Sequence, residues 1–78
     1  VPDAALADTL AEVTATLAAG PTRAYAATKA ALHASSGHTL AQQFDLECRL
    51  QRELGHTDDY LEGMRAFAEK RAPAFTGR

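Results

Sequence analysis

Hydrophobic residues recur along this chain with the period of an α-helix. Between Asp3 and Ala19 the large apolar residues are spaced four, three and four residues apart, at Leu6, Leu10, Val13 and Leu17. That spacing places them on one face of a helix. Gly20-Pro21 ends this first helix, because glycine suits the position after a helix and proline cannot continue the hydrogen-bond ladder.

The same reasoning predicts two more helices in the middle of the chain. The alanine-rich segment Thr22–Ser35 follows directly after Pro21, a residue that favours the start of a helix. Thr39 is a candidate N-cap for a further helix, Leu40–Leu54, because its hydroxyl can accept a hydrogen bond from a free backbone N–H. Gly55 ends that third helix.

A fourth helix is predicted after Thr57, which is again a candidate N-cap. Lys70 and Arg71 are expected in its last turn, and Pro73 stops it. No segment alternates between apolar and polar residues as a half-buried strand does. The sequence therefore predicts an all-α fold of about four helices.

The third helix carries an unusually wide apolar arc. At about 100° per residue, roughly half of its circumference is apolar, at Leu40, Phe44, Leu46, Cys48, Leu50 and Leu54. We therefore expect a central helix packed on more than one side. Glu47 falls within the arc, where a carboxylate needs a partner. We predict an ion pair between Glu47 and Arg71, with Arg65 as the alternative partner.

Size and charge restrict the kind of protein. The chain has 78 residues and 46% of them are apolar, much of that alanine, so one small domain with a modest core is expected. The formal net charge of −2 gives no reason to expect nucleic acid or a membrane surface as a partner. A single cysteine excludes an internal disulfide and suits a reducing cytoplasm.

Candidate reactive groups are present but do not form a recognised site. The histidines and Cys48 lack zinc-ligand spacing, so no metal site is predicted. Cys48 lies in the apolar arc, where cysteine is usually an inert core residue. Glu47 is the sharpest candidate for a general base, since apolar burial would raise its pKa. A structural ion pair is the better interpretation of Glu47.

The C-terminal third of the chain carries an ordered set of short motifs. A capping Thr57 and an Asp are followed by Glu62-Gly63, Ala66-Phe67 and then Lys70-Arg71-x-Pro73-x-Phe75-x-Gly77. Two further blocks lie earlier in the chain, Gly20-Pro21 at the break between the first two predicted helices and Lys29 within the second. This set resembles the C-terminal end of enoyl-CoA hydratase/isomerase (crotonase) subunits. The stretch from Leu46 to Tyr60 is most similar to the ring-epoxide isomerases of phenylacetyl-CoA degradation.

The resemblance implies that residues 1–78 form the helical C-terminal domain of such a subunit, with the catalytic core absent from this chain. In that family the domain covers the active site and builds a trimer, often a dimer of trimers. The residues matched by Phe67 and Lys70 help to bind coenzyme A, which is part of the thioester substrate and not a separate cofactor. We expect a cytoplasmic location, which the single cysteine suits.

The catalytic acids of the family match no position here, so we expect the chain alone to turn over no acyl-CoA. The chain starts at Val1 without an initiator Met, so we expect either that processing removed an N-terminal part or that this is the ordered portion of a longer subunit. The alternative hypothesis is a freestanding helical module that binds partner helices through its apolar faces. A carrier protein is excluded by the lack of an Asp-Ser-Leu attachment motif.

Overall fold

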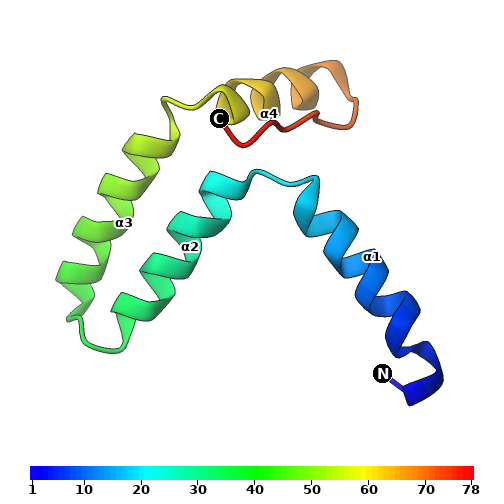
Figure 1. Cartoon of the computed structure of the whole chain (residues 1–78). Coiled ribbons are helices and arrows are strands. Elements are labelled where there is room, and N and C mark those ends of the chain that lie inside the picture. Colours follow the sequence, from blue (N-terminus) through cyan, green and yellow to red (C-terminus); the bar gives the residue numbers. More distant parts are fainter.

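The fold is all-α, as predicted. The computed structural model describes all 78 residues, and it contains no strand. Its elements are a short 3-10 helix η1 and four α-helices (Figure 1): η1 Asp3–Ala5, α1 Leu6–Ala18, α2 Thr22–Ser35, α3 Leu40–Leu54 and α4 Asp58–Glu69. The predicted first helix is therefore divided, with a 3-10 turn before its α-helical part.

Side-chain caps set the starts of α3 and α4 where the sequence placed them. At α3 the Thr39 hydroxyl accepts a hydrogen bond from the Gln42 N–H at 3.3 Å, and the Gln42 side chain accepts from the Thr39 N–H at 2.9 Å. This reciprocal pair is a capping box. At α4 the Thr57 hydroxyl accepts a hydrogen bond from the Tyr60 N–H at 3.2 Å. Both caps satisfy backbone donors that have no partner within the helix.

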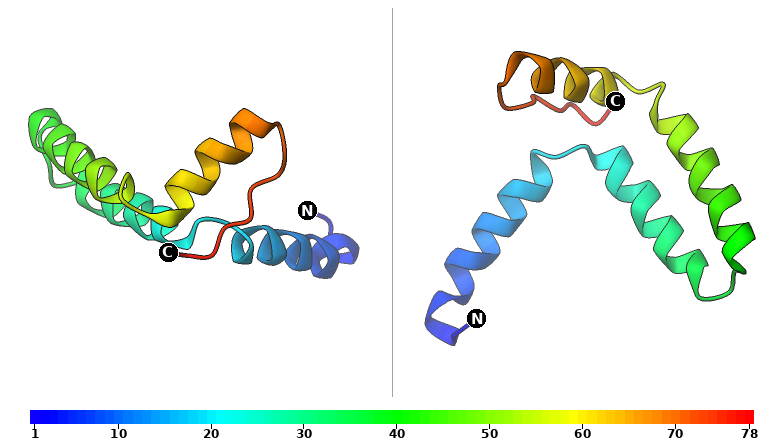
Figure 2. Two further views of the ribbon diagram at one scale, coloured as in Figure 1. Left: turned by 90° about the horizontal axis from the view of Figure 1, so that it is seen from above. Right: turned by 180° about the vertical axis from the view of Figure 1, so that it is seen from behind.

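The helices form an open arrangement. Helices α2 and α3 lie side by side as an antiparallel pair, and α1 extends away from the start of α2 (Figures 1 and 2). Helix α4 lies near the open end of the pair, and residues 71–78 run back along it. The predicted packing of α3 on several sides is wrong for this chain, because α3 makes extensive contacts with α2 alone.

Very little of the chain is buried. Only three residues are buried, and Ala66 is the sole apolar one. The radius of gyration is 15.8 Å, whereas a compact domain of this length has about 11.5 Å. The four apolar residues of the predicted stripe on α1 are each between 49% and 62% exposed. The helices therefore present apolar faces that further protein surface would cover.

None of the helices has both the length and the apolar character that a bilayer-spanning helix requires.

We predict that residues 1–78, produced alone, self-associate through these exposed faces. Burial of apolar surface in an oligomer would compensate for the missing core. Replacing Leu10 and Leu17 with Gln should shift sedimentation toward the monomer, since both residues lie on the α1 stripe. The matched control is Ala15→Gln, on the opposite face of the same helix. A strictly monomeric unsubstituted chain at high concentration would contradict the prediction.

Candidate functional site

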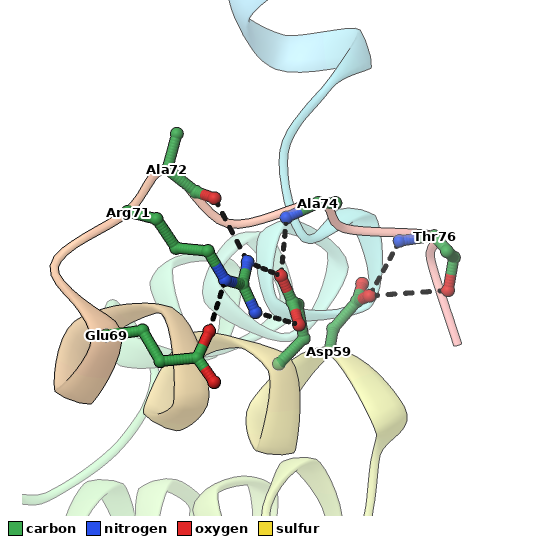
Figure 3. A network of polar contacts seen from close by, with 7 residues as sticks. Asp59, Glu69, Arg71, Ala72, Ala74 and Thr76 are labelled. Atoms are coloured by element: carbon green, nitrogen blue, oxygen red, sulfur yellow. Dashed lines mark hydrogen bonds and ion pairs between the residues drawn. The ribbon is translucent and has the colours of Figure 1, made fainter.

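Glu62, in the second turn of α4, is at the centre of a network of polar contacts that joins α4 to the residues after it. Its carboxylate accepts hydrogen bonds from two guanidinium nitrogens of Arg71, at 2.6 and 3.0 Å (Figure 3). It also accepts the backbone N–H of Ala74 at 2.8 Å. The Arg71 Nε donates to Glu69 at 2.6 Å, and its Nη1 donates to the Ala72 carbonyl at 3.2 Å. Arg71 thus links the middle of α4, its last residue and the tail.

Asp59 holds the final residues of the chain. One carboxylate oxygen accepts the Thr76 N–H at 2.7 Å, and the other accepts the Gly77 N–H at 2.9 Å. The Asp59 N–H donates to the Arg78 carbonyl at 2.8 Å. Asp59 is only 5% exposed, so these bonds satisfy a buried polar side chain. Gly77 has φ 78°, and a Cβ there would lie 2.8 Å from the hydroxyl of Thr22, so a side chain would be strained and crowded.

Together these contacts form what we call the tail latch: the carboxylates of Asp59 and Glu62, with Arg71 and the backbone N–H groups of Ala74, Thr76 and Gly77. Neither carboxylate was assigned a hydrogen-bond partner from the sequence. Backbone N–H groups in a segment of proline and small residues after a helix have no acceptor within the helix. The sequence therefore indicated that nearby side chains, such as carboxylates, would accept hydrogen bonds from them.

The latch shifts the pKa values of its charged pair. The hydrogen bond from Arg71 is the main reason that the pKa of Glu62 falls to about 2, and the Ala74 N–H lowers it further. The same contact raises the pKa of Arg71 above its usual value. Glu62 is therefore ionised at neutral pH and held in that form by its partners.

Lys70 lies at the end of α4 in a left-handed backbone conformation, with φ 53° and ψ 42°. Its N–H donates to the Phe67 carbonyl at 3.3 Å, and the Arg71 N–H donates to the Ala66 carbonyl at 3.0 Å. This is the Schellman arrangement, in which glycine is usual. A lysine there costs about 1 to 3 kcal/mol of backbone strain. The sequence placed Lys70 within the last helical turn, but the helix ends at Glu69.

Phe67 is 87% exposed, the highest value among the large apolar residues. It lies at the edge of an open groove of about 450 Å³ between the start of α2, the end of α3 and α4. The apolar lining includes Phe75, whose ring packs over Gly63 with 3.8 Å between Cε1 and a Cβ built on that glycine. Lys70 follows Phe67 on the exposed end of α4, and Arg23 is a cation of the groove itself.

The predicted ion pair between Glu47 and Arg71 is wrong in this structure. Arg71 pairs with Glu62 and Glu69. Glu47 is exposed and accepts a hydrogen bond from the Gln43 side chain at 2.9 Å. The physical reason is that no element other than α2 covers the apolar arc of α3, so the Glu47 carboxylate stays hydrated and needs no charged partner. Arg65, the alternative partner, forms no ion pair either.

The expectation that Cys48 is a core residue is also corrected, since Cys48 is exposed. Two neighbours in the same arc share this exposure, at 70% for Leu40 and 57% for Phe44. Across the chain, no three His, Cys, Asp or Glu side chains gather where they could hold a metal ion.

The pKa of Glu62 gives the latch a defined pH dependence. Because this pKa is lower in the folded chain than the ordinary 4.5, the ionised carboxylate stabilises the latch above about pH 4.5. Its contribution declines as the pH falls toward 2 and is lost below that. A carboxyl-detected NMR titration should show Glu62 titrating near 2 in the native protein. Arg71→Met should raise this pKa far more than Arg65→Met, and equal effects would contradict the assignment.

Comparison with known proteins agrees with the motif set. The family model described as "Enoyl-CoA hydratase/isomerase" matches residues 1–78. A probable enoyl-CoA hydratase of Rhodobacter capsulatus is 55% identical over 62 residues, which is 80% of this chain and 24% of that protein. The 1,2-epoxyphenylacetyl-CoA isomerase of Escherichia coli is 42% identical over 78 residues, all of this chain and 30% of that protein.

A further relative, the trans-2-decenoyl-(acyl-carrier-protein) isomerase of Streptococcus mutans, is 42% identical over 59 residues, covering 76% of this chain and 22% of that protein. The chain thus spans less than a third of the length of each of these relatives. The match over all 78 residues confirms the resemblance: the chain belongs to the enoyl-CoA hydratase/isomerase family.

Proposed function

We propose that this chain is the C-terminal domain of an enoyl-CoA hydratase/isomerase that acts on acyl-CoA thioesters, and that Phe67 and Lys70 contribute to the binding of coenzyme A. One observation carries this proposal. An almost fully exposed aromatic ring and an exposed lysine lie three residues apart in sequence at the end of α4, directly before Arg71, which the tail latch holds.

The chemistry of the two side chains suits the nucleotide end of coenzyme A. An aromatic ring offers an apolar face against which an adenine can stack. An ammonium is a compact, mobile charge that can meet a phosphate. Lys70 forms no ion pair within the chain, so its charge is available to a ligand.

We propose an oligomerisation role for the exposed apolar faces of α1 and α3. Leu10 on α1 is 62% exposed and Leu40 on α3 is 70% exposed, values that invite burial against another protein surface. We assign them to contacts with the remainder of the enzyme and with further copies, in a cytoplasmic trimer or hexamer. The catalytic acids belong to the part of the enzyme that the matched segment does not include.

The substrate class is proposed from the relatives. The isomerase named for 1,2-epoxyphenylacetyl-CoA aligns with the whole of this chain at 42% identity, which favours a ring-epoxide isomerase of phenylacetate degradation. The relative with 55% identity is named a probable enoyl-CoA hydratase, which favours hydration of an unsaturated thioester. Assay of the native enzyme with both thioesters separates the two reactions.

The alternative function is a freestanding helical module that binds partner helices. The exposed stripe of α1 favours it. The mass of the native gene product distinguishes the two proposals, because the enzyme proposal requires a subunit several times longer than 78 residues, as the relatives are.

The coenzyme A contacts are tested by Phe67→Ala and Lys70→Gly in the native protein. Glycine is chosen at position 70 because it removes the ammonium and retains the left-handed backbone. Calorimetric titration with coenzyme A should show affinity lowered about fivefold by each change, which corresponds to about 1 kcal/mol for an exposed contact. Pantetheine, which lacks the nucleotide, should bind all variants equally.

The matched controls are Phe44→Ala and Lys29→Ala, an exposed aromatic residue on α3 and a lysine on α2. Both should bind coenzyme A as the unsubstituted protein does. Unchanged affinity in the Phe67 and Lys70 variants would remove the proposed contacts.

A further inference from the structure

We propose that Glu62, acting through Arg71, is a positioning residue for coenzyme A: it holds Lys70 in the backbone conformation from which the lysine meets the ligand. The inference rests on the proposed role of Lys70 and extends it to a residue that faces the tail and not the ligand.

The conformation of Lys70 requires an external cause. It is the sole non-glycine residue of the chain with a positive φ, at 53°. Residues other than glycine persist in this region only when their surroundings determine it. Its own side chain supplies no such restraint, because it makes no ion pair or hydrogen bond within the chain.

The two residues on either side of Lys70 add to the restraint of the Schellman backbone hydrogen bonds. The guanidinium of Arg71 pairs with Glu69 at 2.6 Å, which closes a bridge across Lys70. Glu69 is 60% exposed, so this bridge alone is a weak restraint. Arg71 is fixed more firmly by Glu62, which is 20% exposed and binds it with two hydrogen bonds.

Glu62 also fixes the chain beyond Arg71. The same carboxylate accepts the Ala74 N–H at 2.8 Å, so the guanidinium and the following backbone share one anchor. In Figure 3 the dashed lines from Arg71 and Ala74 meet on one carboxylate, which is that of Glu62 and is drawn without a label. Loss of the negative charge at Glu62 would release both donors together, and the backbone around Lys70 would then relax toward less strained conformations.

Relaxation would lower affinity without removing a ligand contact. When a protein must adopt one conformation to bind, its apparent affinity falls by the fraction of molecules that hold that conformation. If the release of Arg71 leaves about one molecule in ten with Lys70 in its left-handed conformation, affinity falls about tenfold.

A double-mutant cycle in the native protein tests the inference. Affinity for coenzyme A is measured for Glu62→Gln, Lys70→Gly and the combined variant, with Glu53→Gln as the matched control on an exposed side chain without a partner. We expect Glu62→Gln to weaken binding about tenfold and the combined variant to bind no more weakly than the weaker single variant. Glu53→Gln should leave the affinity for coenzyme A unchanged. Pantetheine should bind the four variants and the unsubstituted protein equally.

The outcomes separate the inference from the function on which it rests. Unchanged affinity in Lys70→Gly overturns the proposed role of Lys70 and this inference with it. If Lys70→Gly weakens binding but Glu62→Gln leaves it unchanged, the inference alone is overturned. The same holds if the losses of affinity in the two single variants multiply in the combined variant. Equal weakening toward pantetheine also overturns it, because general destabilisation would then explain the loss. If Glu62→Gln does not fold, Arg71→Lys, which retains the charge but not the two-nitrogen contact, replaces it in the same cycle.

Discussion

Two carboxylates on one helix, Asp59 and Glu62, hold the last residues of the chain against α4, and the order of this end of the molecule depends on them. Asp59 binds the backbone of Thr76 and Gly77, and Glu62 binds Arg71 and Ala74. The three buried residues of the chain all lie in α4 or in its N-cap. Polar contacts between a helix and its own tail thus take the place of an apolar core.

The rest of the domain has the opposite character. Its apolar side chains are arranged on helical faces, as the stripe of α1 shows, but those faces are open to solvent. The chain spans less than a third of the length of these relatives and buries a single apolar residue, which is a small core even for a domain of this size. Phe67 differs from the α1 stripe in its sequence neighbours, because Lys70, three residues farther along the chain, is exposed and forms no ion pair.

Local signals in the sequence predicted the local structure well. Thr39 and Thr57 marked two helix starts correctly because capping depends on neighbours within one turn. The sequence did not predict the partner of Arg71, because that contact requires the tail to reverse along α4. A helical projection treats each helix as packed, so it assigned Glu47 a buried setting that this chain does not provide. The left-handed conformation of Lys70 was not predicted either, because it depends on the backbone hydrogen bonds that end α4 and on the contact of Arg71 with Glu62.

The most direct test of the latch is amide hydrogen exchange in the native protein. The account predicts slow exchange at Ala74, Thr76 and Gly77, whose N–H groups donate to the two carboxylates. Asp59→Ala should abolish protection at Thr76 and Gly77 and leave Ala74 protected by Glu62. Exchange of all three amides at the rate of an unstructured chain in the unsubstituted protein would contradict the account.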